Sequence, residues 1–175
     1  GSAIKGSSNY QYSRSHASRP SNITDAPTKE ELATIDERDR RWAWVEIDRS
    51  AIQYNVMQTK RLLPNSCRLM AVKADAYGHG ALEVAKAACS AGASYLGVAT
   101  VDEGIELREA GMREPILILS QPPAEAIPLL LYYQIRPAVY TSEFAIAYAE
   151  AADAQGIKAP YHLAINSGMN RIGVR

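Results

Sequence analysis

Two side chains in one short segment could act on a carbonyl compound. Lys73 follows an apolar run over residues 69–72, and Tyr77 comes four residues later. A lysine at the end of a buried strand is costly unless its charge is used or lost, and a desolvated amine is a nucleophile towards an aldehyde. If the extended conformation persists to Tyr77, both side chains face the same side. Gly78 and Gly80 then predict a tight turn.

Arg171 is a second candidate for chemistry. It follows Gly168, Met169 and Asn170, just past an apolar stretch over residues 161–166. A guanidinium can fork onto a carboxylate or donate to another anionic oxygen. If each apolar stretch is a strand of a parallel barrel, Arg171 lies on the same barrel face as Lys73, at the carboxyl ends of the strands.

These two segments carry a family resemblance. Residues 71–80 (AVKADAYGHG) resemble the cofactor-lysine segment of alanine racemases, and residues 165–174 (INSGMNRIGV) resemble that family's Gly-Met-x-Arg-x-Gly segment. The resemblance implies that pyridoxal 5'-phosphate (PLP) forms an aldimine with Lys73 and that the Tyr77 hydroxyl reaches the cofactor phosphate. It also implies that Arg171 binds the carboxylate side of the substrate and touches the ring oxygen of PLP.

The implied activity is that of an isomerase that interconverts L-alanine and D-alanine and supplies D-alanine for peptidoglycan. Inversion needs a base on each face of a planar intermediate. By resemblance, Lys73 serves the D-face, and a tyrosine from the C-terminal β-domain of the partner subunit serves the other, in a homodimer. Two alternatives stay open: a racemase of broader specificity for serine or lysine, and a non-catalytic PLP-binding barrel protein. A downstream β-domain with its tyrosine would discriminate between the catalytic and the non-catalytic protein.

The second segment departs from the family pattern at two positions. Many members carry a lysine seven residues before the arginine, where it becomes carbamylated and orients the guanidinium. Here that position is Ala164, and the aspartate common in the segment is Asn166. We therefore expect the carbamate to be absent or replaced, for example by a bound anion, and Arg171 to be held less firmly.

The chain between residues 41 and 175 alternates apolar runs with helical patterns. Continuous apolar runs are typical of parallel strands that are buried on both faces. Strands are expected at 42–48, 68–74, 95–99, 116–119, 137–140 and 161–166. Helices are expected at 50–63 (capped by Ser50), 81–91, 101–110, 124–133 and 143–155. This alternation predicts an α/β fold with a parallel sheet but does not by itself separate a doubly wound sheet from a barrel.

The resemblance favours a PLP-binding (β/α)₈ TIM barrel. A complete barrel takes roughly 250 residues, and about six strands are expected here. Residues 41–175 are therefore interpreted as the N-terminal part of the barrel domain, with the remaining barrel and the C-terminal β-domain absent. Residues 1–40 are expected to be a flexible tail with a short polar helix, which starts at the capping box of Thr28 and Glu31 and runs to about Arg38.

Composition narrows the classes of partner. The chain has 175 residues, with 19 Lys+Arg and 19 Asp+Glu, so its net charge is zero and favours neither nucleic acid nor an anionic membrane. The sequence contains no apolar run that would predict a membrane span or a signal peptide. Cys67 and Cys89 are expected to be small core residues in a reducing, cytoplasmic setting, and no metal-ligand spacing is present.

The remaining polar candidates receive structural roles. His79, between the two glycines, is interpreted as structural. His162, inside an expected strand, is interpreted as a core histidine whose hydrogen bonds are satisfied. Asp48, Asp102 and Glu103 stand at helix starts, where acidic side chains complement the helix dipole.

Overall fold

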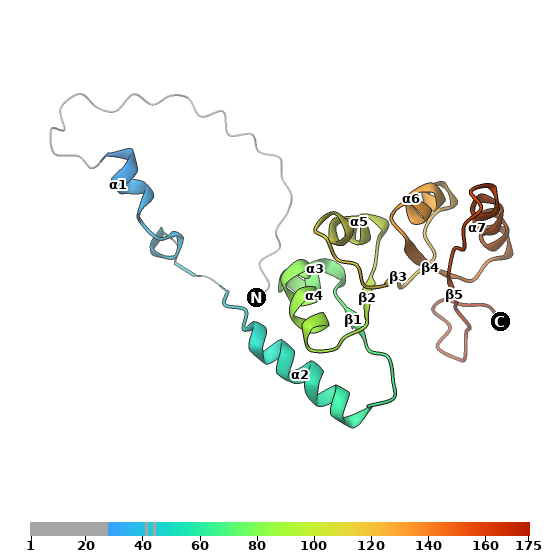
Figure 1. The fold of residues 1–175 in the computed structure, drawn as a ribbon, viewed down its shortest axis with the longest axis horizontal. Helices are drawn as coiled ribbons and strands as arrows, with labels where there is room; N and C mark the ends of the chain where they lie inside the picture. Colours follow the sequence, from blue (N-terminus) through green and yellow to red (C-terminus); the bar gives the residue numbers. More distant parts are fainter. Residues whose placement is uncertain (1–27, 41, 44) are drawn as a thin grey trace. The chain divides into compact units, whose positions relative to one another are not determined.

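The computed structural model describes residues 28–40, 42–43 and 45–175. Residues from Glu46 to Arg175 form one compact unit that contains the sheet (Figure 1). The tail expected over residues 1–27 lies outside the described residues. None of the described helices is long and apolar enough to cross a membrane.

The capping box near the N-terminus is confirmed. The Thr28 hydroxyl accepts from the Glu31 amide at 3.2 Å, and the Glu31 carboxylate accepts from the Thr28 amide at 2.6 Å. The helix that follows, α1 (Lys29–Ala33), is shorter than expected, and a 3₁₀ turn, η1 (Glu37–Arg40), comes after it.

The sheet has five parallel strands in the order of the sequence. They are β1 (Leu69–Ala71), β2 (Tyr95–Val98), β3 (Ile116–Ile118), β4 (Ile135–Val139) and β5 (His162–Leu163). A doubly wound sheet reverses its strand order at a switch point, whereas a barrel adds strands in one direction. The sheet does not reverse, and α5, α6 and α7 lie along the same side of it (Figure 1). The fold is therefore part of a (β/α)₈ TIM barrel, as expected.

Apart from α3, which the sequence does not predict, the helices fall close to their expected positions. They are α2 (Arg49–Leu62), α3 (Lys73–Gly78), α4 (Ala81–Ser90), α5 (Val101–Glu109), a 3₁₀ turn η2 (Ala124–Ala126), α6 (Ile127–Tyr132) and α7 (Ser142–Ala154). The core forms where strand side chains such as Leu96, Ile116 and Val139 pack against helix side chains such as Leu107 and Phe144. All three residues of β3 are buried, which explains its continuous apolar sequence.

The strand expected at 42–48 is wrong. Of the residues described in that span, none is in a strand, so the sheet has five strands rather than six. Trp42 is fully exposed and Val45 is 81% exposed. Apolar and aromatic residues favour a strand only where a neighbouring strand and a buried face are available.

The start of α2 differs from the expected cap by two residues. Asp48, not Ser50, is the N-cap, because its Oδ1 accepts from the amides of Ser50 at 2.8 Å and Ala51 at 3.2 Å. The Ser50 hydroxyl hydrogen bond contributes most to lowering the pKa of Asp48, and the two amides add to it. The charge role expected for Asp48 is confirmed.

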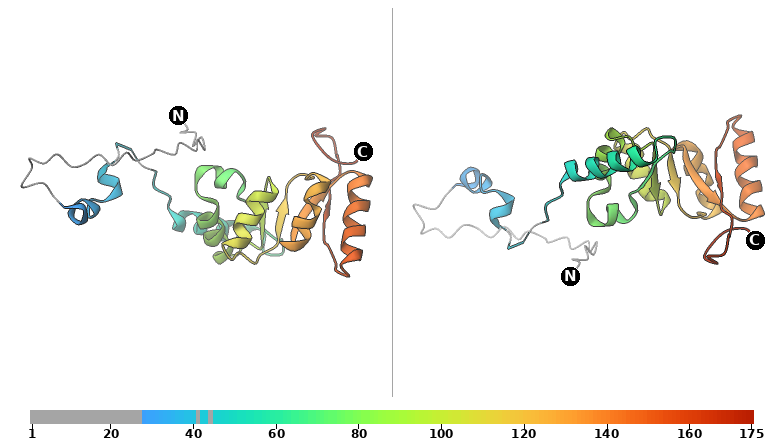
Figure 2. Two further views of the ribbon diagram at one scale, coloured as in Figure 1. Left: turned by 90° about the horizontal axis from the view of Figure 1, so that it is seen from above. Right: turned by 90° about the horizontal axis from the view of Figure 1, so that it is seen from below.

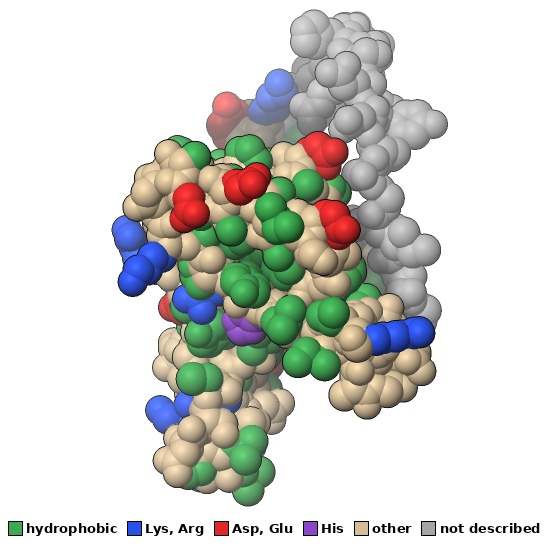
Figure 3. Space-filling model, turned by 90° about the vertical axis from the view of Figure 1, so that its right-hand side faces the viewer, with side chains coloured by type: hydrophobic (Ala, Val, Ile, Leu, Met, Phe, Trp, Pro, Cys, Tyr) green, Lys and Arg blue, Asp and Glu red, His purple; other side chains and the backbone are tan. Residues whose placement is uncertain are grey.

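The sheet is open on the side of β5. The strand is shorter than the expected 161–166, and Leu163 and Ile165 remain largely exposed. Figure 3, which faces this end, shows hydrophobic side chains gathered over it. His162 is exposed on β5 and makes an edge contact with the ring of Tyr95, so its expected place in the core is wrong. In a barrel, the free edge of β5 would form hydrogen bonds with a further strand.

The two cysteines differ in environment. Cys89 is partly buried beside the core, as expected, but Cys67 is exposed. Burial, and after it the Glu114 carboxylate, raises the pKa of Cys89 to about 11. The thiolate is the reactive form, so at pH 8 only about one in a thousand Cys89 side chains is reactive.

We therefore expect iodoacetamide at pH 8 to modify Cys67 while Cys89 stays unmodified. Peptide mapping at timed intervals measures both rates, and labelling in denaturant shows that both peptides can be detected. Equal rates in the native protein would contradict this prediction.

Candidate functional site

Lys73 lies just beyond the carboxyl end of β1. The strand ends at Ala71, three residues earlier than expected, and Lys73 is the first residue of α3. The next four residues, from Ala74 to Tyr77, have φ between 52° and 57° and ψ between 33° and 50°. They form a turn of left-handed helix, which costs non-glycine residues roughly 1–2 kcal/mol each. Such strain is concentrated at functional sites.

This turn corrects the expected relation between Lys73 and Tyr77. The extended conformation does not persist, and the two residues are separated by one left-handed turn instead. Tyr77 is 62% exposed, and Lys73 is partly exposed. The left-handed turn therefore presents a primary amine and a phenol hydroxyl within four residues of each other.

Local hydrogen bonds close the turn. The Ala76 amide donates to the Val72 carbonyl at 2.9 Å, and the Gly80 amide donates to the Asp75 carbonyl at 2.9 Å. Gly78 and Gly80 have φ of 87° and 89°, so the expected glycine turn is confirmed. A Cβ atom at either glycine would meet no atom within 4 Å, so open space borders the turn.

Two polar side chains near this turn have structural roles. The Nδ1 atom of His79 lies 2.9 Å from the Ala76 carbonyl oxygen, which agrees with the structural role expected for this histidine. The Asp75 Oδ1 atom accepts from the Ala81 amide at 2.8 Å and so satisfies the first amide of α4.

Two other side chains connect the ends of neighbouring strands by hydrogen bonds, and neither connection was predicted from the sequence. Glu103 accepts from the amides of Ala74 and Ala99, each at 2.7 Å, and so links the ends of β1 and β2. Gln121 accepts from the Tyr140 amide at 2.9 Å, beyond β4. The Ser/Thr-x-x-Glu spacing that ends at Glu103 signals a capping box, but no sequence signal identifies Gln121.

The expected charge role of the acids in α5 is confirmed. Asp102 and Glu103 lie in its first turn, and Thr100 is its N-cap in a second capping box with Glu103. Acidic side chains in this position complement the helix dipole.

Arg171 follows a loop that is organised by Asn166. The Asn166 Oδ1 atom accepts from the amides of Gly168 at 3.1 Å and Asn170 at 3.0 Å, and its Nδ2 atom donates to the Asn170 side chain at 2.9 Å. An aspartate could accept the same two bonds but could not donate the third. A Cβ atom at Gly173 would lie 2.5 Å from the Asn166 amide nitrogen, so this position requires glycine.

The structure places Lys73 and Arg171 at the same edge of the sheet but does not bring them into contact. They follow β1 and β5, which are four strand spacings apart, or roughly 19 Å along the sheet. In both views of Figure 2, α3 and the loop after β5 project from one edge of the sheet. Within the described residues, the amine of Lys73, the hydroxyl of Tyr77 and the guanidinium of Arg171 have no hydrogen-bond or ion-pair partner.

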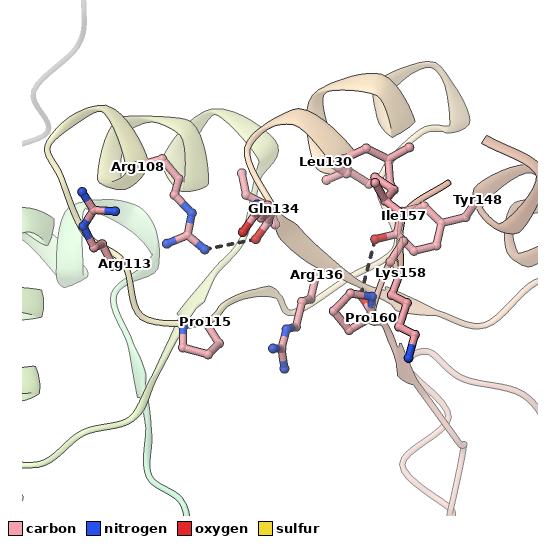
Figure 4. A pocket seen from close by; sticks show the side chains of 13 residues that line it. Arg108, Arg113, Pro115, Leu130, Gln134, Arg136, Tyr148, Ile157, Lys158 and Pro160 are labelled. Atoms are coloured by element: carbon pink, nitrogen blue, oxygen red, sulfur yellow. Dashed lines mark hydrogen bonds between the residues drawn. The ribbon is translucent and has the colours of Figure 1, made fainter. Parts of the chain in front are cut away.

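A basic pocket of about 360 Å³ lies at the opposite end of the strands (Figure 4). Pro115 and Gln134, which precede β3 and β4, line it together with Arg108 and Arg136. Arg108 donates to the carbonyls of Tyr133, Met112, Glu114 and Gln134 at 2.8–3.0 Å. Burial is the main cause that lowers the pKa of this guanidinium. The amino ends of barrel strands serve stability rather than catalysis, so Arg108 is a structural residue.

The carboxyl ends of the strands carry three side chains that can bind or react with a ligand, namely those of Lys73, Tyr77 and Arg171. The described residues contain no cluster of three or more His, Cys, Asp or Glu that could hold a metal. The carboxyl edge instead offers an amine that can react with an aldehyde, a hydroxyl that can donate to a phosphate, and a guanidinium that can donate to an anionic oxygen.

Residues 47–175 match the family of the alanine racemase N-terminal domain. The chain is 46% identical over 136 residues to alanine racemase 1 of Oceanobacillus iheyensis, covering 77% of this chain and 36% of that protein. It also resembles the crystal structure of alanine racemase from E. faecalis, with a TM-score of 0.65, 46% identity, and coverage of 73% of this chain and 35% of that one.

A histidine racemase from Leuconostoc mesenteroides shares the fold with a TM-score of 0.66 and 32% identity, covering 73% of this chain and 34% of that structure. The chain thus spans about a third of the length of these relatives.

Proposed function

Because this chain belongs to the alanine racemase family, we propose that it is the lysine-bearing part of a PLP-dependent racemase that interconverts L-alanine and D-alanine. The left-handed turn after β1 is the observation that carries this proposal. It presents Lys73 and Tyr77 beside open space, and neither side chain is engaged by another described residue. A strained turn that carries an unpaired amine supports a site at which the amine binds a reactive ligand.

The residues present fit PLP. Lys73 would hold the cofactor covalently through its amine, Tyr77 would donate its hydroxyl to the phosphate, and Arg171 would donate to the phenolic oxygen of the ring and bind the substrate carboxylate. When bound, PLP supplies an electron-accepting ring that makes the Cα proton of an amino acid acidic.

The proton transfer then depends on the protein's own bases. The Lys73 amine would add or remove the Cα proton on one face, and a second base must act on the other. We propose that this second base is a tyrosine of the partner subunit's β-domain in a homodimer. The product would serve peptidoglycan synthesis in the cytoplasm.

Borohydride reduction of the full-length protein tests the attachment site. Reduction fixes a covalently held cofactor, so peptide mapping is expected to find the pyridoxyl group on Lys73. A label on Lys60 or Lys86 would contradict the assignment.

A racemase of broader specificity is the second candidate, because a histidine racemase shares this fold. Relative kcat/KM values for alanine, serine, lysine and histidine decide between the two. Racemisation of none of them by a protein that binds PLP would favour a non-catalytic barrel.

A further inference from the structure

The backbone on both sides of Lys73 is held by hydrogen bonds to other elements. Before it, the Val72 amide donates to the Gly97 carbonyl of β2 at 2.8 Å. After it, the Ala74 amide donates to the Glu103 Oε1 atom at 2.7 Å. The Ala74 amide belongs to the peptide that follows the Cα atom of Lys73. Its hydrogen bond to Glu103 therefore restrains the ψ angle of Lys73 and the backbone that carries the lysine side chain.

The second carboxylate oxygen of Glu103 anchors this contact to the sheet. Its Oε2 atom accepts from the Ala99 amide at 2.7 Å and from the Thr100 amide at 3.3 Å, at the end of β2. Each oxygen therefore serves a different strand end. Among the described residues, Glu103 is the only residue outside 72–81 whose side chain hydrogen bonds to the backbone of the left-handed turn.

We propose that Glu103 is a positioning residue for Lys73. Its carboxylate holds the strained turn in the conformation that presents the amine, and it acts through the Ala74 amide without touching the ligand. This inference rests on the proposed function of Lys73 as the cofactor lysine. It differs from the capping role of Glu103 in α5, in which the Glu103 amide donates to the Thr100 hydroxyl and the Glu103 Oε2 atom accepts from the Thr100 amide. The bond to the Ala74 amide uses the other carboxylate oxygen, Oε1.

Replacing Glu103 with glutamine tests whether its carboxylate positions Lys73. Glu103→Gln keeps the shape of the side chain but has one oxygen acceptor in place of two. The NH₂ group of the glutamine must then face the amide of either Ala74 or Ala99, and two donors cannot form a hydrogen bond. We expect the Ala74 amide of the cofactor-free, full-length protein to exchange with solvent roughly tenfold faster or more, because a hydrogen bond to a charged acceptor is lost. Hydrogen–deuterium exchange of the peptide that covers residues 72–80 measures this change.

The rate at which PLP attaches to the variant is a second measurement. We expect PLP to attach to Glu103→Gln roughly tenfold more slowly, while the thermal midpoint stays near that of the wild type. Stopped-flow absorbance measures attachment. If Glu103→Gln does not fold, Glu103→Asp provides the same test, because it keeps the charge but is too short to reach both strand ends.

Two matched variants define the controls. Thr100→Ala removes the hydroxyl that caps α5 and leaves the Glu103 carboxylate, so Ala74 exchange is expected to stay slow. Glu106→Gln makes the same chemical change one turn further along α5, at an exposed side chain, and is expected to change neither readout. If Thr100→Ala reproduces the effect, Glu103 acts only as a cap and the inference is wrong.

The outcomes also separate this inference from the proposed function. A wild-type protein that binds no PLP would overturn the proposed function, and the role of Lys73 with it. A protein that binds PLP on Lys73 but shows unchanged Ala74 exchange in Glu103→Gln would overturn this inference alone.

Discussion

Replacing Lys73 with alanine in the full-length protein is expected to lower alanine racemisation by more than about a hundredfold. The variant lacks the amine that would hold the cofactor and one of the two proposed bases. The hydrogen bonds that close the left-handed turn involve the backbone and the side chains of Asp75 and Glu103, not the lysine amine. The turn should therefore survive the change. Steady-state racemisation of both enantiomers, with circular dichroism of the variant, measures the effect.

Lys86→Ala is the matched control for this prediction. Lys86 is a half-exposed lysine on α4 that pairs with Glu83 at 3.8 Å, so its loss should leave activity unchanged. Near-normal turnover in Lys73→Ala would show that the reaction does not use this lysine.

The parts of the fold that sequence predicts well are those in which burial determines the pattern. Strands β2 and β3 and helices α4, α5 and α7 begin within a residue of their expected positions, because their apolar residues form the core. Residues 42–48 have similar composition but no neighbouring strand among the described residues, and the expectation there is wrong. Apolar composition alone does not supply a hydrogen-bonding partner.

The conformation of the site could not be predicted from local propensity. Ala74, Ala76 and Tyr77 disfavour left-handed backbone, so local propensity does not predict this turn, and the strand was expected to continue to Ala74. The turn depends on tertiary contacts such as the bond from Ala74 to Glu103, which is 29 residues away in the chain. The glycines at 78 and 80, by contrast, signalled their own turn because positive φ suits glycine.

Arg171→Lys is expected to lower racemisation roughly tenfold or more while PLP remains attached to Lys73. Lysine keeps the positive charge but loses the planar fork that can donate to two oxygens at once. The Asn166 side chain would still organise the preceding loop, because none of its hydrogen bonds involves Arg171. The effect should therefore come from the guanidinium itself.

Steady-state racemisation of both alanine enantiomers, together with the PLP content of the purified variant, measures this prediction. Arg113→Lys is the matched control, because Arg113 is exposed and precedes β3 at the opposite end of the strands.

Ala164→Lys tests the missing carbamate. If the new lysine becomes carbamylated, activity should stay similar or rise modestly and should depend on bicarbonate, since a carbamate would hold a guanidinium that now has no partner among the described residues. Near-normal turnover in Arg171→Lys would show instead that this arginine serves structure alone.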